Sequence, residues 1–455
     1  MSTSRHRPGC FSDIAERIDA LRMARGDVPA VGFFEQVREL VLIASASRGG
    51  SSVFTEFLRQ SRSMTHFRGE TNAFLFLRGL GHPDTGMGSD VLEPRHAKEG
   101  DTQGLSGDFS MDVGVPCALE TQADVYRFST ELTVRLHLQW PDVNVAVEDV
   151  EWAVARALEV LASERGWRLG EALDVQAFHA IFIGHLRQRW PEINPYYYDL
   201  SRSLIARYCP DAPAAAGPPG PRILEEPPFV TIAPWRRADS QMLAELPLVV
   251  KTPSNVYRFD FFRALFPNAR LRVMHLTRNA AASINGLYDG WRYEKGFYSH
   301  RVPTLSISGY SDVQPGWGTG WWNYDLPPGW ADLCDRRLEE VCAVQWRSAH
   351  EATLAYLERE QEVGRGAMRV RFEDLISEST AASTVRDVVS WLGVAPDAPL
   401  RDSTPCELPP VMATDKPRHR RWFEKADMLE PVLFSPEIRE MMRALGYPLQ
   451  PEAWT

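Results

Sequence analysis

A glycine- and serine-rich segment near the N-terminus has the residues needed to hold an anion. Residues 42–53 read LIASASRGGSSV, in which Gly49 and Gly50 let the backbone approach a ligand closely. Ser51 and Ser52 begin a predicted helix, so amide N–H groups, two hydroxyls and the helix dipole would converge on one anion. The segment is not a Walker A motif, because no lysine precedes Ser51. A simple turn between a strand and a helix is the alternative interpretation.

Two cations follow predicted strands further along the chain. Arg278 comes directly after the strand RLRVMHLT, and Lys251 ends the apolar strand at 246–251. Because α/β sheets bind ligands at the carboxyl ends of their strands, both side chains are candidates for anion contacts. Lysine is rare in this sequence, with five lysines against 45 arginines. A lysine at position 251 therefore indicates that this position needs a compact ammonium. A structural ion pair for Arg278 and a solvated strand end for Lys251 are the alternatives.

The elements that must position these residues are apolar strands alternating with helices. Strands are predicted at 40–44, 246–251, 270–277 and 368–372, and helices at 255–266, from about 280, and at 336–362, 381–392 and 435–445. This alternation predicts an α/β fold, with a parallel sheet flanked by helices on both faces. We expect this core to comprise residues 1–80 and 229–455.

Three segments interrupt the alternation. Residues 81–210 are predicted to be a large, all-helical insertion, with helical periodicity at about 123–138, 147–164, 172–190 and 195–208. Residues 211–228, DAPAAAGPPGPRILEEPP, have the composition of a linker or a long surface loop. Residues 296–335 are predicted to be an aromatic, glycine- and proline-rich loop.

The overall composition restricts the class of protein. The 455 residues carry 50 Lys and Arg against 60 Asp and Glu, so the chain lacks the basic field typical of nucleic-acid binding. Its start has no apolar signal-peptide core, and no stretch of about 18 apolar residues occurs. The six cysteines form no Cys-x-x-Cys pair, unlike a zinc site or a disulfide framework. We expect a soluble cytoplasmic protein with no metal, no nucleic-acid partner and no membrane contact.

The two anion motifs resemble a known family. SASRGGSS and LTRN, about 230 residues apart, are similar to the phosphosulfate loop and the 3′-phosphate motif of sulfotransferases that use 3′-phosphoadenosine-5′-phosphosulfate (PAPS). The similarity is closest to tyrosylprotein-type and bacterial small-molecule sulfotransferases. It extends over residues 250–288, over VRFEDL within 369–375 and over WLG at 391–393. The resemblance implies a P-loop-like α/β core with PAPS as the sulfuryl donor.

The resemblance also implies roles for residues that would hold the donor. Arg48 matches the loop position that contacts the sulfonate and bridging oxygen, and Arg278 matches the arginine that binds the 3′-phosphate. The family's serine eight residues after that arginine is Gly286 here, and Ser283, one helical turn earlier, is expected to replace it. The 5′-phosphate cradle, the adenine contact and the basic C-terminal segment correspond to Gly49, Gly50, Ser51, Ser52, Phe372, Arg418 and Arg420. A solvated basic face is the alternative for the last two.

Two residues are implied to carry out the chemistry. Lys251 matches a strand-end lysine that would stabilise negative charge on the bridging oxygen of the leaving group. Glu70, in HFRGETNAF, matches the glutamate that serves as the general base in the tyrosylprotein-type branch. A helix-capping role beside Thr71 is the alternative for Glu70. His66 is the reserve candidate for the base, with an ordinary surface histidine as its alternative.

The acceptor is expected to be a small and hydrophobic molecule with a phenolic or alcoholic hydroxyl. Trp317, Trp321 and Trp322 crowd into the aromatic loop, which indicates either an apolar or ring-bearing acceptor or a buried core. The predicted function is therefore sulfuryl transfer from PAPS, with a natural product as one class of acceptor. An ATP-dependent small-molecule kinase and a catalytically silent nucleotide-binding protein are the alternatives.

Overall fold

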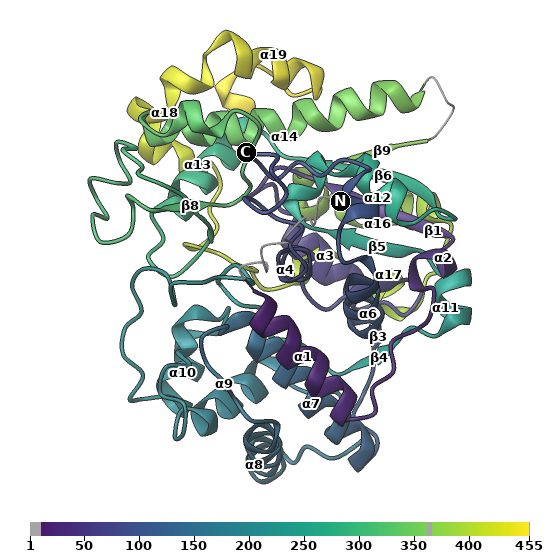
Figure 1. The fold of residues 1–455 in the computed structure, drawn as a ribbon. Coiled ribbons are helices and arrows are strands. Elements are labelled where there is room, and N and C mark those ends of the chain that lie inside the picture. Colours follow the sequence, from purple (N-terminus) through teal and green to yellow (C-terminus); the bar gives the residue numbers. More distant parts are fainter. Residues whose placement is uncertain (1–10, 362–365, 455) are drawn as a thin grey trace, which may run out of the picture.

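A seven-stranded sheet forms the centre of the computed structural model, which describes residues 11–361 and 366–454 (Figure 1). The strand order is β4-β3-β2-β5-β1-β6-β9. The strands are β1 (Glu39–Ala44), β2 (Thr65–Phe67), β3 (Val113–Pro116), β4 (Trp235–Arg237), β5 (Leu248–Lys251), β6 (Arg270–Thr277) and β9 (Met368–Arg371). The five strands from β2 to β9 in this order are parallel, whereas β3 is antiparallel to both of its neighbours, β2 and β4. The α/β prediction is confirmed, with a mixed rather than a wholly parallel sheet.

Helices cover both faces of this sheet. Along β1, Leu40 and Leu42 belong to one hydrophobic cluster, and Val41 and Ile43 belong to another on the opposite face. The first face packs on α12 (Phe259–Leu265), α13 (Ala280–Trp291) and α14 (Leu338–Gln361), and the second on α3 (Ser51–Arg59), α15 (Phe372–Ile376) and α16 (Ala381–Leu392). Because both faces are buried, the central strands are continuously apolar rather than alternating.

The remaining helices are shorter or lie outside this central layer. The α-helices are α1 (Ser12–Ala24), α2 (Phe33–Gln36), α4 (Asn72–Leu77), α5 (His96–Glu99), α6 (Thr102–Asp112), α11 (Ser240–Glu245), α17 (Ala398–Asp402), α18 (Ala426–Leu433) and α19 (Pro436–Ala444). Short 3-10 helices are η2 (Pro253–Tyr257), η3 (Trp330–Leu333), η4 (Pro405–Glu407), η5 (Arg421–Lys425) and η6 (Pro451–Ala453). The helix predicted over 255–266 is thus divided into η2 and α12. No helix among the described residues has both the length and the apolar character needed to cross a membrane.

The segment predicted to be an all-helical insertion, 81–210, is not wholly helical. Its strand β3 pairs with β2 in the central sheet, with Gly114 opposite His66. Glycine is needed at position 114, because a side chain on it would collide with Arg236 and Trp235 of β4. The rest of the segment contains α7 (Gln122–Gln139), α8 (Val147–Arg165), α9 (Val175–Leu186), η1 (Pro195–Tyr197) and α10 (Arg202–Tyr208). These helices surround a second hydrophobic core and gather at one end of the molecule (Figure 1).

Two connecting segments are more ordered than their composition predicts. Residues 211–228 contain no helix or strand, but Leu224, Pro227 and Pro228 are buried, so this segment is not an exposed linker. The aromatic segment 296–335 contains an antiparallel pair, β7 (Tyr298–Arg301) and β8 (Trp321–Asn323). Many apolar side chains of both segments, among them Leu224 and Trp322, are buried in tertiary contacts that composition does not reveal.

The parallel strands place the predicted site residues in a row. Glu70 follows β2, Lys251 ends β5, Arg48 follows β1, Arg278 follows β6 and Phe372 follows β9. These strands are neighbours in that order, and the carboxyl ends of parallel strands lie at one edge of the sheet. Residues that are far apart in the sequence therefore meet along this edge at about 4.8 Å per strand.

Candidate active site

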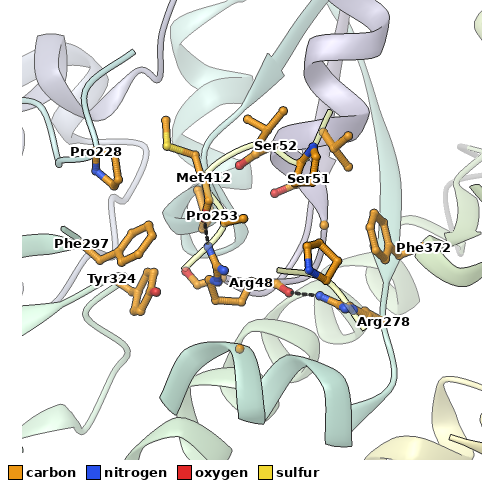
Figure 2. Close-up of a pocket in the computed structure, with 18 of the residues that line it drawn as sticks. Arg48, Ser51, Ser52, Pro228, Pro253, Arg278, Phe297, Tyr324, Phe372 and Met412 are labelled. Carbon is orange, nitrogen blue, oxygen red and sulfur yellow. Dashed lines mark hydrogen bonds between the residues drawn. The ribbon is translucent and has the colours of Figure 1, made fainter. Parts of the chain in front are cut away.

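A cavity of about 630 Å³ opens at the carboxyl ends of the parallel strands. Its walls come from the loop after β1, the segments after β2 and β5, the start of α13, residues 223–230, residues 297–299 and 324, and residues 405–422. The lining includes most of the predicted donor-binding residues, namely Arg48, Gly50, Ser51, Ser52, Arg278, Phe372, Arg418 and Arg420, together with Glu70 and Lys251. The structure thus brings these residues into one cavity. Figure 2 shows Arg48, Ser51, Ser52, Arg278 and Phe372 among them.

The loop after β1 is held in an unusual backbone conformation. Arg48 has φ of 62° and Gly50 has φ of 90°, both in the left-handed region. A Cβ at Gly50 would lie 2.1 Å from the Phe372 ring, so only glycine fits at this turn. No side chain caps the N-terminus of α3, which leaves the amides of its first turn beside the lining residues Ser51 and Ser52. This arrangement suits a phosphate or sulfonate group.

A buried residue outside the cavity lining fixes the start of this loop. Ser47 donates a hydrogen bond to Asp325 at 2.6 Å, and Tyr257 donates to the other carboxylate oxygen at 3.1 Å. Burial raises the pKa of Asp325 to about 6, and the hydrogen bond from Ser47 opposes that shift. Sequence reasoning missed Asp325, because it lies 278 residues beyond Ser47 in the aromatic segment.

Lys251 lies between the anion loop and Glu70. Its Nζ donates to Ser52 Oγ at 3.3 Å and forms an ion pair with Glu70 Oε1. The lysine side chain is 6% exposed, whereas Glu70 is 38% exposed, so the carboxylate can meet a ligand that enters the cavity. The ammonium therefore contacts both the loop suited to anions and the candidate base.

Arg278 borders the other side of the loop. Its Nη1 donates to the Arg48 carbonyl at 3.2 Å, and its guanidinium lies over the Phe372 ring at 4.9 Å (Figure 2). Burial lowers the pKa of Arg278 to about 10, and the Glu373 carboxylate partly opposes that shift. The side chain is still cationic at neutral pH and is positioned to bind an anion.

Arg48 projects into the centre of the cavity. Its Nη1 donates to the Met412 carbonyl at 2.7 Å, and its guanidinium lies 5.1 Å from the Phe297 ring centroid (Figure 2). Met412 belongs to residues 405–422, which form one wall and include Arg418 and Arg420. Arg418 pairs with Asp415 and Glu424, so part of its charge is neutralised within the same segment. The basic C-terminal segment therefore contributes to the cavity rather than forming only a solvated face.

Several lining residues were not predicted from the sequence. Glu226 and Pro228 come from the segment predicted to be a linker, and Phe297 and Tyr324 come from the aromatic segment. The rings of Phe297 and Tyr324 stack with centroids 4.7 Å apart. The one sequence signal for Glu226 was a pair of acidic residues in an otherwise Pro-, Gly- and Ala-rich segment.

The three tryptophans proposed for the acceptor do not line this cavity. Trp322 is fully buried and packs edge-to-face on Trp291 at 5.0 Å, and Trp321 packs on Tyr298 at 6.3 Å. Trp317 is partly buried and packs against the cluster that contains Tyr298 and Trp321. The alternative interpretation, that these residues are part of the core, is the one the structure supports.

Ser283 does not line the cavity either. It is fully buried in α13, and its Oγ has no hydrogen-bond partner among the described residues. From the same helix, Asn285 and Gly286 reach the lining, and a Cβ at Gly286 would lie 3.2 Å from Arg48 Cβ. Gly286 leaves space for the Arg48 side chain, and the predicted replacement by Ser283 lacks access to a ligand in this cavity.

His66 is a buried residue of the sheet and not a surface histidine. It lies on β2 between Gly114 and Val249, is 1% exposed and does not line the cavity. Burial, together with the Arg59 cation, lowers its pKa to about 3. A neutral imidazole inside the sheet has no path to an acceptor hydroxyl, so Glu70 is the better candidate for the base.

We expect His66 to contribute to acid sensitivity instead. The unfolded chain binds a proton at His66 below about pH 6.5, whereas the folded chain does so only near pH 3, so stability falls as the pH decreases between these values. In wild type, the free energy of unfolding should fall between about pH 7.5 and about pH 4.5. In His66→Gln this fall should be smaller by about 2–3 kcal/mol. Urea unfolding of both proteins at the two pH values measures this difference. An unchanged pH dependence, or a selective loss of turnover, would contradict this assignment.

Comparison with known proteins gives few matches. No family model matches the chain, and no curated protein matches it. The sulfotransferase domain from the curacin biosynthetic pathway matches over 91% of this chain and 99% of its own, with 11% identity and a TM-score of 0.37. Sulfotransferase STF9 from Mycobacterium avium matches over 96% of this chain and 84% of its own, with 13% identity and a TM-score of 0.36. Both TM-scores are low, so neither similarity assigns a function to this chain.

Among residues 11–361 and 366–454, no group of three or more His, Cys, Asp or Glu side chains is arranged to hold a metal ion.

Proposed function

We propose that this protein is a sulfotransferase that moves the sulfuryl group of PAPS to a hydroxyl of a small hydrophobic molecule. The observation that carries the proposal is the contact of Lys251 with both Ser52 of the anion loop and Glu70. An ammonium between an anion site and a carboxylate base is what in-line transfer to a hydroxyl requires, because charge develops on both sides of the transferred group. PAPS supplies the activated sulfuryl group when it is bound.

The cavity residues fit such a donor. The uncapped first turn of α3 with Ser51 and Ser52 suits a 5′-phosphate, and the glycine at position 50 keeps the backbone close enough to donate its amides. Arg278, one strand away from this loop, suits a second phosphate on the same ligand. The Phe372 ring lies between them and offers an apolar surface for a base.

Each polar residue then has a distinct role. Arg48 points into the cavity centre, where it neutralises charge on the group being transferred. Lys251 stabilises the charge that grows on the leaving oxygen, and Glu70 takes the proton of the acceptor hydroxyl. The apolar wall formed by Phe297, Tyr324 and Pro228 excludes water from the acceptor end.

A small-molecule kinase is the weaker proposal. Phosphoryl transfer from ATP normally uses a loop lysine and carboxylates that hold Mg²⁺ beside the phosphates. In this chain the loop position before Ser51 is Gly50, and the Glu70 carboxylate near the loop is paired with Lys251. The two reactions differ in their products, so one assay distinguishes them.

The deciding experiment measures the nucleotide released with a panel of phenols and alcohols. Release of 3′,5′-adenosine bisphosphate from PAPS, with a sulfated product in the mass spectrum, supports sulfuryl transfer. Release of ADP from ATP supports the kinase. Binding of 3′,5′-adenosine bisphosphate without turnover of any acceptor supports a silent nucleotide-binding protein.

Arg278→Ala is expected to remove selectivity for the 3′-phosphate. A guanidinium can bind a phosphate through two hydrogen bonds, and losing a desolvated charge partner should weaken 3′,5′-adenosine bisphosphate binding by roughly 30-fold or more. AMP binding should stay close to wild type. Calorimetric titration of both nucleotides measures the two affinities. Arg371→Ala is the control, because Arg371 ends the neighbouring strand β9 but does not line the cavity. Equal losses for the two nucleotides would contradict the assignment.

A further inference from the structure

Glu226 lies in the cavity wall, and within residues 11–361 and 366–454 it forms no ion pair with a cationic side chain. Its carboxylate accepts a hydrogen bond from Ser299 of β7, a neutral hydroxyl. The charged and titratable groups that act on it are Glu70, Lys251 and Asp325. Of these, Lys251 forms its ion pair with Glu70, so it offsets the charge of Glu226 only in part and from a distance.

The other carboxylates of the lining have stronger partners. Glu225 is paired with Arg135, Asp415 with Arg418, and Glu70 with Lys251. Glu373 accepts hydrogen bonds from the Asn279 backbone amide and from Tyr447. Among the described residues that line the cavity, Glu226 is thus the carboxylate whose negative charge is least compensated. A poorly compensated carboxylate in a cavity wall is unfavourable when ionised, so a ligand that supplies a positive charge would stabilise its ionised form.

The surroundings of Glu226 also suit a cation. Phe297, whose backbone amide bonds to the Pro227 carbonyl, presents its ring beside this wall and already lies next to the Arg48 guanidinium. Tyr324 stacks on Phe297, is 5% exposed and lines the cavity, while its hydroxyl is buried against Gly290 of α13. Aromatic rings attract cations through the negative charge of their faces, so this wall suits a ligand cation.

We propose that the hydroxyl-bearing acceptor also carries a protonated amine, which binds to the Glu226 carboxylate while the hydroxyl faces Glu70. This inference rests on the proposed sulfuryl transfer and specifies its substrate class. The acceptor is then an amphipathic molecule with an apolar or aromatic body, a hydroxyl to be sulfated and an ammonium directed at Glu226.

Three phenols that differ in one substituent test this inference. They are tyramine, 4-ethylphenol and 3-(4-hydroxyphenyl)propionate, which carry an ammonium, no charge and a carboxylate. With the enzyme saturated by 3′,5′-adenosine bisphosphate, we expect calorimetry to give tyramine about a tenfold or greater advantage over 4-ethylphenol, since charged hydrogen bonds are the stronger ones. The propionate should bind most weakly. The same order is expected in kcat/KM with PAPS.

Two matched variants assign the preference to Glu226. Glu226→Gln keeps the shape and removes the charge, so tyramine should lose its advantage while 4-ethylphenol binds as in wild type. Ser299→Ala removes the hydrogen bond to Glu226 but keeps the carboxylate, so the preference for the amine should remain. A preference that survives in Glu226→Gln would overturn the assignment.

Proton release gives a readout that does not depend on turnover. Burial, aided by the nearby Glu70 charge and opposed by the Ser299 hydrogen bond, raises the pKa of Glu226 to about 8. Near pH 7 the empty cavity therefore holds a largely protonated Glu226, and an ammonium ligand favours the ionised form. Titrations in two buffers of different ionisation enthalpy should show release of up to about one proton with tyramine and none in Glu226→Gln.

The outcomes separate this inference from the proposed function. Absence of 3′,5′-adenosine bisphosphate binding and of sulfated product would overturn both. Sulfated product without any binding preference for tyramine over the other two phenols would overturn the amine inference alone. A uniform loss of kcat for all phenols in Glu226→Gln, with unchanged binding, would make Glu226 part of the proton transfer instead and would also overturn it.

Discussion

Lys251→Met is expected to lower kcat by about 10²–10³-fold, the range found when one donor to a developing negative charge is removed. The affinity for 3′,5′-adenosine bisphosphate should stay close to wild type, because the charge on the leaving oxygen that Lys251 stabilises develops only in the transition state. Methionine keeps about the length of the side chain and removes its charge from the position between Ser52 and Glu70.

Single-turnover kinetics together with calorimetry test the Lys251 variant. Lys295→Met is the matched control, since Lys295 lies over the Tyr196 ring at 4.6 Å and does not line the cavity. If Lys251→Met weakened nucleotide binding as much as it slowed turnover, the lysine would act in binding rather than in the chemical step.

Glu70→Gln should lose turnover in a way that depends on the acceptor. A general base contributes about 10²–10⁴-fold, and an alkyl alcohol needs that help more than a nitrophenol, whose proton leaves readily. We therefore expect the largest loss of kcat with the least acidic acceptor and a small loss with a nitrophenol. PAPS binding should be retained, because glutamine preserves the volume of the side chain.

The measurement is a plot of kcat against acceptor pKa for wild type and for Glu70→Gln. Glu56→Gln serves as the control, because Glu56 pairs with Arg59 on α3 and does not line the cavity. A steeper dependence on acceptor pKa in Glu70→Gln supports the base. Parallel lines for the two enzymes would show that Glu70 acts only through its ion pair with Lys251.

The central fold could be predicted because its signals are local. A buried strand such as residues 40–44 is a short apolar run bounded by polar or small residues, and the structure has β1 at Glu39–Ala44. The site residues at strand ends followed from this pattern, since parallel strands bring their carboxyl ends together. Glu70, Lys251, Arg48 and Arg278 therefore meet at one edge although 230 residues separate the last two.

The missed features depend on tertiary contacts. Pro, Gly and Ala in 211–228 predict a linker, but the apolar residues Ile223 and Leu224 anchor its second half in the cavity wall and carry Glu226 with them. The strand β3 is four residues long, too short to be seen within a helical segment. The tryptophans of 296–335 have no periodicity that separates a ligand contact from a core contact, and Trp322 lies in the core.

The hydrogen bond from Arg48 to the Met412 carbonyl joins residues that are 364 positions apart in the chain. Contacts of such long sequence separation form late in folding, because the entropy of closing a large loop opposes them until other contacts are in place. During synthesis, the anion loop emerges long before the segment that forms the opposite wall. The loop therefore remains without its C-terminal wall until nearly the whole chain is made, and an N-terminal fragment that ends before residue 405 cannot reproduce the cavity.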